Sequence, residues 1–288
     1  MSKTPSASSQ PSASFKARFW DRFASGYAGG TIGDWAGYER SLVRTRELLG
    51  PHASVLEIGC GTGSTALTLS LFTGPYLATD IAPQMIALAH QRLALSPRPA
   101  LRFQVDDSDA TASDLDGPFD AVLAFNVLHL LDDLDAATAR CASVLKPGGW
   151  FISKTPCLRE MNPLIAGLAV PLMRALRLAP PVLNLREADL VAACKRQGLE
   201  VIGVERHASS GRDVRPFVVA RKPAGAADFD ELKKHYTDEQ IVEIVASIAL
   251  FGYLNRWNDT MATTLEPLAT QVAERAIGPA GWTPGKHG

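Results

Sequence analysis

An acidic residue and three alternating glycines form the stretch of this sequence with the clearest chemical meaning. Glu57 is followed by Gly59, Gly61 and Gly63, directly after a short apolar run. Each glycine lacks a Cβ, so the backbone can turn sharply and a ligand can approach it closely. A dinucleotide fingerprint would need its next glycine at the position that Ser64 occupies. The spacing therefore excludes that fingerprint and indicates a ligand loop of another kind.

The order Glu-x-Gly-x-Gly-x-Gly resembles motif I of the class I S-adenosylmethionine (SAM) dependent methyltransferases. The resemblance implies that backbone N–H groups of the three glycines lie against the methionine part of SAM. It also implies that the Glu57 carboxylate reaches the SAM ammonium group, directly or through water. The alternative is a glycine-rich turn that binds no ligand.

A second acidic residue, Asp80, ends the next strand-like run. In nucleotide-binding sheets an acidic side chain at this place accepts hydrogen bonds from the ribose hydroxyls. The residues from Ile81 onward resemble the family's D-x-S-x-x-M turn, with Ala82 in place of serine. We expect Asp80 and Ile81 to contact SAM, the alternative being that Asp80 only caps the following helix.

Two neighbouring aspartates follow the third strand-like run. The family has an acidic residue here that accepts from the adenine amino group. The spacing favours Asp107 for this role, with Asp106 facing solvent.

The fourth strand-like run leads into a segment that resembles the family's FD-x-V-x-x-x-x-x-LHH sequence, with Leu130 in place of the second histidine. The resemblance places Asn126 and His129 near the sulfonium and the open substrate side. His129 is either a catalytic base or a residue that holds this loop in place. Tyr27, in the aromatic-rich segment before the glycine run, is a further expected SAM contact.

The sequence Leu-Lys-Pro-Gly-Gly at 145–149 closely resembles a turn common to these enzymes, and it supports the assignment independently of the glycine run. The whole resemblance covers 15–222 and extends to small methyltransferases related to those of ubiquinone and menaquinone biosynthesis.

Alternating strands and helices must position these residues. Residues 15–49 are predicted to be helical. Strands are predicted at 55–58, 76–80, 101–105, 119–125, 150–154, 200–206 and 216–221, and helices at 64–72, 83–95, 133–145 and 186–197. Such alternation is typical of an α/β, mostly parallel sheet with helices on both faces. The resemblance implies a Rossmann-like sheet of seven strands with an antiparallel final strand.

Composition narrows the class of protein. The chain has 288 residues, is 46% hydrophobic and carries a formal net charge of −1. This balance gives no sign of nucleic acid as the main partner. Four scattered cysteines without a C-x-x-C pair are typical of reduced, cytoplasmic proteins, and we expect no metal site. Residues 1–14 are predicted to be a disordered tail, and no stretch is predicted to span a membrane.

The expected reaction is in-line transfer of a methyl group to a small acceptor. A sulfonium is already a good methyl donor, so placement of the two reactants is the main task and a general base is optional. The insert at 157–185 is rich in leucine and other apolar residues, which favours an apolar acceptor covered by this helix. The alternative is that its apolar stripe packs on the core or on a partner.

The segment 223–288 is predicted to be a linker followed by a helical module. Residues 228–288 resemble the C-terminal half of carboxymuconolactone decarboxylase and alkylhydroperoxidase-D-like proteins, but the C-x-x-C needed for their redox activity is absent from this sequence. An apolar stripe from Ile241 to Leu254 needs a partner surface, which favours an oligomerisation or docking module. Two alternatives for the chain remain: a non-catalytic SAM-binding scaffold, and a fusion whose module serves a thiol-peroxidase-type partner.

Overall fold

The computed structural model describes residues 15–29, 33–107, 117–160, 182–211, 213–224 and 233–247. The chain divides into two compact units, 1–224 and 225–288. The expectations for the tail at 1–14, for the insert at 161–181 and for the module at 248–288 fall outside the described residues.

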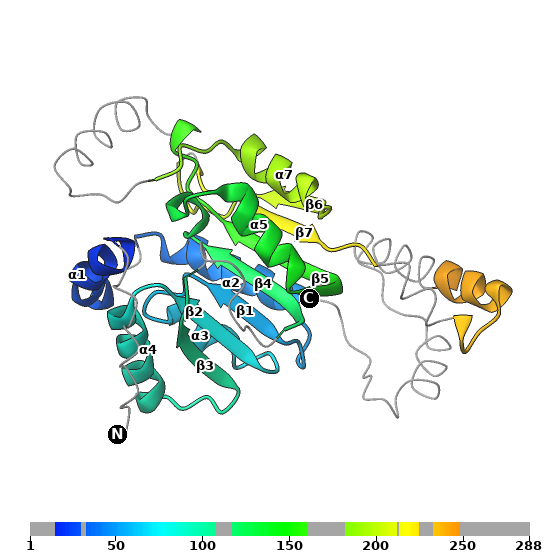
Figure 1. Cartoon of the computed structure of the whole chain (residues 1–288), viewed down its shortest axis with the longest axis horizontal. Helices are drawn as coiled ribbons and strands as arrows, with labels where there is room; N and C mark the ends of the chain where they lie inside the picture. The colour runs from blue at the N-terminus through cyan, green and yellow to red at the C-terminus, as the bar shows by residue number, and fades with distance from the viewer. Residues whose placement is uncertain are drawn as a thin grey trace, which may run out of the picture. The chain divides into compact units, whose positions relative to one another are not determined.

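A seven-stranded sheet forms the centre of the first unit, in the order β3-β2-β1-β4-β5-β7-β6 (Figure 1). The first five strands pair in parallel, and β7 pairs antiparallel with both β5 and β6. This confirms the Rossmann-like sheet with an antiparallel final strand. The strands are Val55–Ile58 (β1), Tyr76–Asp80 (β2), Leu101–Val105 (β3), Phe119–Phe125 (β4), Leu145–Lys154 (β5), Glu200–Glu205 (β6) and Phe217–Arg221 (β7).

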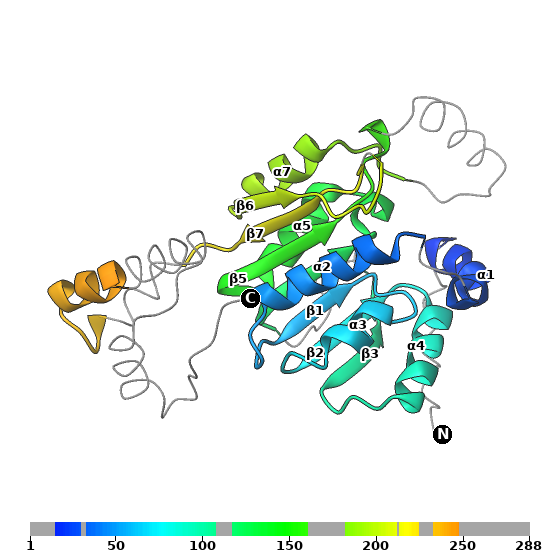
Figure 2. The ribbon, with the colours of Figure 1, turned by 180° about the vertical axis from the view of Figure 1, so that it is seen from behind.

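Helices cover both faces of this sheet. One face, turned to the viewer in Figure 1, carries α5 (Leu134–Ser143) and α7 (Glu187–Arg196). The opposite face, seen in Figure 2, carries α2 (Trp35–Leu48) and α3 (Ser64–Leu69). In addition, α1 (Phe15–Gly29) packs on α4 (Pro83–Leu95). Since both faces are covered, the central strands are nearly continuous apolar runs, as parallel sheets require.

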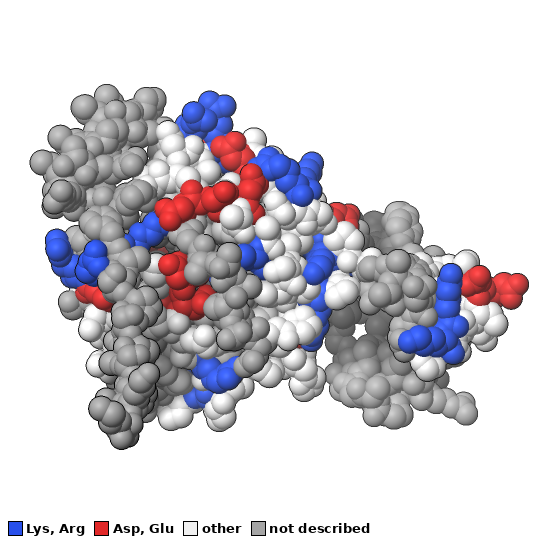
Figure 3. Space-filling view, in the orientation of Figure 1, with Lys and Arg blue, Asp and Glu red and all other residues white. Residues whose placement is uncertain are grey.

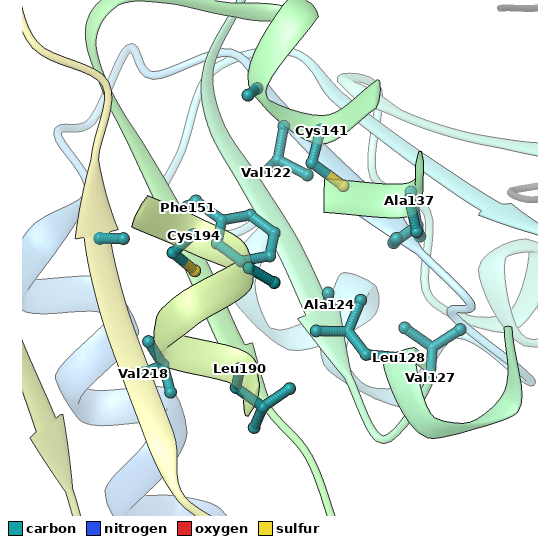
Figure 4. Packing of buried hydrophobic residues seen from close by; sticks show 14 of the residues in the cluster. Val122, Ala124, Val127, Leu128, Ala137, Cys141, Phe151, Leu190, Cys194 and Val218 are labelled. Carbon is teal, nitrogen blue, oxygen red and sulfur yellow. The ribbon is translucent and has the colours of Figure 1, made fainter. Parts of the chain in front are cut away.

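Two apolar clusters fix the sheet between its helices. The cluster under α5 and α7 joins strand residues to both helices; Figure 4 labels Val122, Ala124, Val127, Leu128, Ala137, Cys141, Phe151, Leu190, Cys194 and Val218. The cluster on the other face includes Val55, Ala78, Ile86 and Phe103. Burial of one such large side chain stabilises a fold by about 1.5–3 kcal/mol. The carboxyl ends of β1, β2 and β4 are therefore held by a rigid, well-packed layer.

Two local predictions need correction. The helical run predicted over 15–49 is two helices, and α2 begins after Asp34, whose Oδ1 accepts a hydrogen bond from Gly37 N at 2.9 Å. The predicted turn at 145–149 lies inside β5, because Leu145 already pairs with Phe119 before a shift in register. Gly148 accommodates this shift with a φ of +74°.

The described part of the second unit, 233–247, contains a helical stretch at 238–247. Its start is a reciprocal capping box: Thr237 N donates to Gln240 Oε1 at 3.0 Å and Gln240 N donates to Thr237 Oγ1 at 3.3 Å. Thr237 is thus the N-cap of this helix. Within the described residues, no helix combines the length and apolar character that crossing a membrane requires.

Candidate functional site

The glycine loop links β1 to α3, and its three glycines all have positive φ angles, of +65°, +55° and +78°. A Cβ on Gly59 would lie 2.4 Å from Val127 Cγ2, and one on Gly63 would lie 2.5 Å from Phe103 Cζ. A Cβ on Gly61 would meet no protein atom within 4 Å. Gly59 and Gly63 are therefore required by packing within the protein, whereas Gly61 alone faces open space that a ligand can enter.

Asp80 holds the middle of this loop. Its Oδ2 accepts a hydrogen bond from Gly61 N at 2.8 Å, and its Oδ1 accepts one from Ala82 N at 2.9 Å. Burial raises the pKa of this carboxyl, although both backbone N–H groups act in the opposite direction. A carboxylate has about four acceptor sites, so further hydrogen bonds to a ligand remain available. Ile81, also predicted to contact SAM, is half-buried beside Asp80.

Asp80 does not form a helix cap of the usual kind. The N-cap residue of α4 is Ala82, which has no capping side chain, and Asp21 Oδ1 of α1 instead accepts from Gln84 N in the first turn at 2.9 Å. Asp80 instead bonds the N–H of the N-cap residue itself, which orders the turn and leaves the carboxylate at the sheet edge.

Glu57 is buried at the end of β1, with 3% of its surface exposed. The Tyr76 hydroxyl donates to its Oε2 at 2.7 Å. Burial raises the pKa of Glu57 to about 8, against the opposing effect of this hydrogen bond. Above it, Tyr38 of α2 and Thr65 of α3 share a hydrogen bond of 3.1 Å between their hydroxyls. In the described part of the chain, no ion pair neutralises Glu57.

The two aspartates after β3 have different surroundings from those predicted. Asp106 was expected to face solvent, but its side chain is buried, 3.6 Å from Arg140 Nη2. The same arginine donates from Nη1 to the backbone oxygen of Asp107 at 2.9 Å. Asp107 itself is half-buried. Arg140 thus draws Asp106 inward, and Asp107 remains the aspartate assigned to adenine.

Asn126 and His129 follow β4. Asn126 is exposed, has a φ of +55°, which few residues other than glycine adopt, and donates its N–H to Lys154 O at 2.7 Å. His129 lies in a short 3-10 helix, η1 (Leu128–Leu130). Burial lowers the pKa of His129 to about 4, so the imidazole is neutral at pH 7. Its Nδ1 is buried and has no hydrogen-bond partner among the described residues.

Both ends of the insert after β5 are attached to this region. Leu183 N donates to His129 O at 2.7 Å. Next to it, Arg159 N donates to Leu185 O at 3.2 Å, and Glu187 N donates to Glu160 Oε1 at 2.8 Å. The residues that precede and follow 161–181 are therefore held side by side, close to η1.

Arg92 of α4 is a site residue that sequence patterns did not indicate. Its Nη1 donates to Thr62 Oγ1 at 2.8 Å, to Thr62 O at 3.2 Å and to Ser64 Oγ at 3.0 Å. The guanidinium therefore holds the glycine loop from outside. Only the folded arrangement reveals this contact, because an arginine on an amphipathic helix is otherwise an ordinary surface residue.

A row of buried, hydrogen-bonded polar side chains was also not predicted from the sequence. Lys154 Nζ, at the end of β5, donates to Ser41 Oγ at 2.8 Å, and Ser41 Oγ lies 3.0 Å from His207 Nδ1. His207 Nε2 lies 3.1 Å from Glu205 Oε2. Burial lowers the pKa of both Lys154 and His207. This chain fastens α2 to the end of the sheet, beside the candidate site.

Lys146 lies away from the candidate site, and the prediction for Tyr27 is not tested by the described residues. Lys146 of the predicted turn is at the opposite, amino edge of the sheet, where its Nζ donates to Asp120 Oδ2 at 2.8 Å. Asp120 Oδ2 also accepts from Ser54 N and Ser54 Oγ, both at 2.8 Å. This motif is architectural and takes no part in the ligand site. Tyr27 belongs to α1, but its side chain lies outside the described residues.

The site fits a ligand that carries positive charge. Glu57 and Asp80 are acidic groups near the ends of the adjacent strands β1 and β2, and Gly61, which Asp80 contacts, faces open space. Neither has an ion-pair partner among the described residues, and burial raises the pKa of both. An ammonium group near Glu57 and hydroxyl groups near Asp80 would satisfy them. The donor set therefore fits an amino-acid nucleoside such as SAM, and the described residues contain no cluster suited to a metal ion.

Charged side chains over the visible face are mixed. Figure 3 shows acidic and basic residues interspersed, without a broad basic area on the described part of this face. The view gives no support for a phosphate backbone as ligand there.

A family model matches the central part of the sheet domain. Residues 56–151 match the family model described as "Methyltransferase domain". The matched range begins in β1 and ends in β5, so it contains the glycine loop, Glu57, Asp80 and η1. This part of the chain is therefore similar to a methyltransferase domain, and the sheet has the Rossmann-like arrangement.

Curated relatives match parts of the chain. The hybrid PKS-NRPS synthetase mpsA of Macrophomina phaseolina is 32% identical over 182 residues, which are 59% of this chain and 4% of that protein. The ubiquinone biosynthesis O-methyltransferase of Xanthomonas campestris pv. campestris is 31% identical over 105 residues, 36% of this chain and 44% of that protein. The matches thus span less than half the length of each of these two relatives.

A solved structure shares the fold. The magnesium protoporphyrin IX methyltransferase ChlM of Synechocystis PCC 6803, with bound SAH, superposes with a TM-score of 0.53 and 20% identity, over 72% of this chain and 95% of that one. At this identity the likeness concerns the fold alone.

Proposed function

We propose that this methyltransferase domain transfers a methyl group from SAM to a small, apolar acceptor by in-line displacement. The observation that carries the proposal is the pair of neighbouring acids, the buried Glu57 and the half-buried Asp80, of which Asp80 holds a glycine that faces open space. Acids in such a place need a cationic or hydroxyl-rich ligand to satisfy them, and the match to a methyltransferase domain covers these positions.

Each residue would have a defined role. Bound SAM supplies a methyl group on a positively charged sulfur. Glu57 accepts from the ammonium group, and the free acceptor sites of Asp80 take the ribose hydroxyls. Asp107 accepts from the adenine amino group. Asn126, exposed in its left-handed conformation, lies between this pocket and the acceptor side.

His129 is better suited to orient the acceptor than to remove its proton. A general base works best when its pKa is near the operating pH, and burial lowers that of His129 to about 4. Its unpartnered Nδ1 can accept one hydrogen bond from an acceptor hydroxyl. Most of the rate enhancement would then come from alignment of donor and acceptor, which can contribute about 7–11 kcal/mol in well-oriented reactions.

The acceptor class is inferred from the relatives and from the apolar insert. One relative is named as an O-methyltransferase of ubiquinone biosynthesis and the other as a PKS-NRPS synthetase, and both names concern small organic products. Leucine and other apolar residues dominate the insert at 157–185. We therefore assign a quinone-, lipid- or polyketide-like acceptor rather than a nucleic acid.

A binding isotherm with SAM and with its demethylated product, S-adenosylhomocysteine, tests the proposal. We expect micromolar affinity for the intact chain and a loss of at least about tenfold, or roughly 1.4 kcal/mol, in Asp80→Ala. Asp120→Ala is the matched control, because it removes an aspartate at the opposite sheet edge. The absence of measurable binding by the intact chain would refute the proposal.

A screen of apolar acceptors then separates an enzyme from a scaffold. Turnover of any acceptor, detected as S-adenosylhomocysteine formation, supports the enzyme. Tight SAM binding without turnover across the screen would favour the non-catalytic alternative.

For the second unit we propose a docking or oligomerisation role. Val242 and Val245 are 66% and 46% exposed on the described part of its helix. Sedimentation of the intact chain with both valines changed to aspartate should show a smaller particle than the unmodified chain. The resemblance to alkylhydroperoxidase-D-like proteins remains a prediction.

A further inference from the structure

Tyr76 occupies an unusual place beside the proposed SAM site. It begins β2, its side chain is 1% exposed, and it pairs in register with Val55, two positions before Glu57. Its hydroxyl extends along the sheet to Glu57 Oε2, at 2.7 Å. A tyrosine is not needed to fill this apolar position, since phenylalanine has nearly the same shape. The hydroxyl must therefore be explained by what it contacts.

Among the described residues, the Tyr76 hydroxyl is the side-chain group that donates a hydrogen bond to the Glu57 carboxylate. The other titratable groups facing Glu57 are Asp80 on β2, Cys60 in the glycine loop and Tyr38 on α2. None of them is a cation. A buried carboxylate in such surroundings ionises with difficulty, and a hydrogen bond donated to its charged form assists ionisation.

We propose that Tyr76 is a positioning residue that holds Glu57 ready to ionise, and that SAM binding expels a proton from Glu57 when the ligand ammonium arrives. This inference rests on the proposed function, because it assumes that SAM binds with its ammonium near Glu57. The inference assigns a role to Tyr76, which lies outside the glycine motif, and it couples SAM binding to the release of one proton.

The burial of Glu57 determines whether ligand affinity rises or falls with pH. Burial raises the pKa of Glu57 to about 8, so in the free protein the carboxyl is mostly protonated at pH 7. An adjacent ammonium favours the charged form and lowers this pKa. Binding at pH 7 should therefore release close to one proton, and affinity should rise with pH until it exceeds the pKa of the free protein.

Removal of the Tyr76 hydroxyl should destabilise only the ionised form of Glu57. In Tyr76→Phe the pKa of Glu57 rises further, so deprotonation on binding becomes harder. We expect about tenfold weaker binding at pH 7, since a hydrogen bond to a charged group contributes about 1.5–3 kcal/mol. The ratio of Kd values between variant and unmodified chain should fall towards one near pH 9.

Titration calorimetry with S-adenosylhomocysteine from pH 6 to pH 9 tests this. The amino group of the ligand also titrates in this range, but it does so equally for every variant, so ratios of Kd isolate the protein. Repetition in two buffers of different ionisation enthalpy counts the released protons. Tyr38→Phe is the control, because its hydroxyl bonds Thr65 and not Glu57; we expect less than a twofold change at every pH.

Glu57→Gln provides a second variant of similar shape that cannot release the proton. It should bind without the linked proton, and its affinity relative to Tyr76→Phe should become more favourable as the pH falls. A pH-independent ratio for Tyr76→Phe, or no proton release by the unmodified chain, would overturn the inference while leaving SAM binding intact. No binding by the unmodified chain would instead overturn the proposed function.

Discussion

The two edges of the sheet use acidic residues in opposite ways. At the amino edge, Asp120 accepts from Lys146 and from Ser54, and although burial acts against them, these contacts hold the pKa of Asp120 below its usual value. At the carboxyl edge, burial raises the pKa of Glu57 and Asp80, which have no ion-pair partner among the described residues. One edge satisfies its charges within the fold, and the other leaves them for a ligand. The difference separates an acid that stabilises the fold from the two acids that we propose to bind SAM.

The largest expected effect on ligand affinity comes from replacing one glycine at each edge of the sheet. Gly61→Leu fills the open space beside Asp80, so we expect at least about a hundredfold loss of S-adenosylhomocysteine affinity, roughly 2.7 kcal/mol. Gly148→Leu is the matched control, since Gly148 also has a positive φ, of +74°. Both variants should lose about 1–2 kcal/mol of unfolding free energy through backbone strain. Equal affinity losses in the two would contradict the division between the edges.

Asp120→Asn tests the amino edge. Loss of the carboxylate weakens its contacts with Lys146 and Ser54, so we expect a loss of about 1–2 kcal/mol in unfolding free energy at pH 7. Because the pKa of Asp120 is lowered in the folded state, this difference should persist at neutral pH and shrink only as the pH falls below the ordinary pKa of an aspartate. Denaturant unfolding at several pH values measures it. Ligand affinity should not change, and a tenfold change would argue against a purely structural role.

Glu57→Gln should have the opposite effect on stability. The pKa of Glu57 is raised in the folded state, so the stability that its protonated form provides is complete below 4.5 and is lost as the pH rises to about 8. Without ligand, the glutamine variant should therefore be more stable than the unmodified chain at pH 8, by a difference on the order of 4 kcal/mol, with little difference at pH 4.5. Thermal unfolding across this range provides the check. A variant that is destabilised equally at every pH would show that the carboxyl is structural.

The smallest expected effect concerns Arg92, which holds the glycine loop from α4. Arg92→Gln should weaken S-adenosylhomocysteine binding about threefold, roughly 0.65 kcal/mol, because the loop loses the hydrogen bonds to Thr62 and Ser64. Unfolding free energy should change by less than about 0.5 kcal/mol, as is usual for surface substitutions. Arg98→Gln is the control, because in the described contacts Arg98 follows α4 and donates to the nearby backbone oxygens of Ser96 and Pro97.

The strands and the principal acids were predictable because their signals are local. The bounds predicted for β1 to β4 agree with the structure, since each is an apolar run that ends at glycine, acid or asparagine. The same locality misled the prediction at 145–149, where turn-forming residues are drawn into β5 by pairing between Leu145 and Phe119. Local chemistry indicated a turn, and a contact with a distant strand extended the sheet.

The supporting contacts of the site could not be predicted, because their partners are remote in sequence. Tyr76 reaches Glu57 from the neighbouring strand, and Arg92 of α4 reaches Thr62 in the glycine loop. Arg140 likewise draws Asp106 inward, against the expectation that this aspartate faces solvent. Such side chains carry no periodic or spacing signal of their own. Only the packing of helices on the sheet brings them to the loop.

The attachment of both ends of the insert next to η1 has an evolutionary consequence. Leu183 is bonded to His129, and Glu187 to Glu160, so the intervening chain starts and finishes at fixed points. Doubling the length of a closed loop costs only about 0.6 kcal/mol in entropy. The segment can therefore be exchanged, lengthened or shortened between these fixed points while the glycine loop keeps its geometry. New acceptors could be acquired in this way without renewed optimisation of the glycine loop.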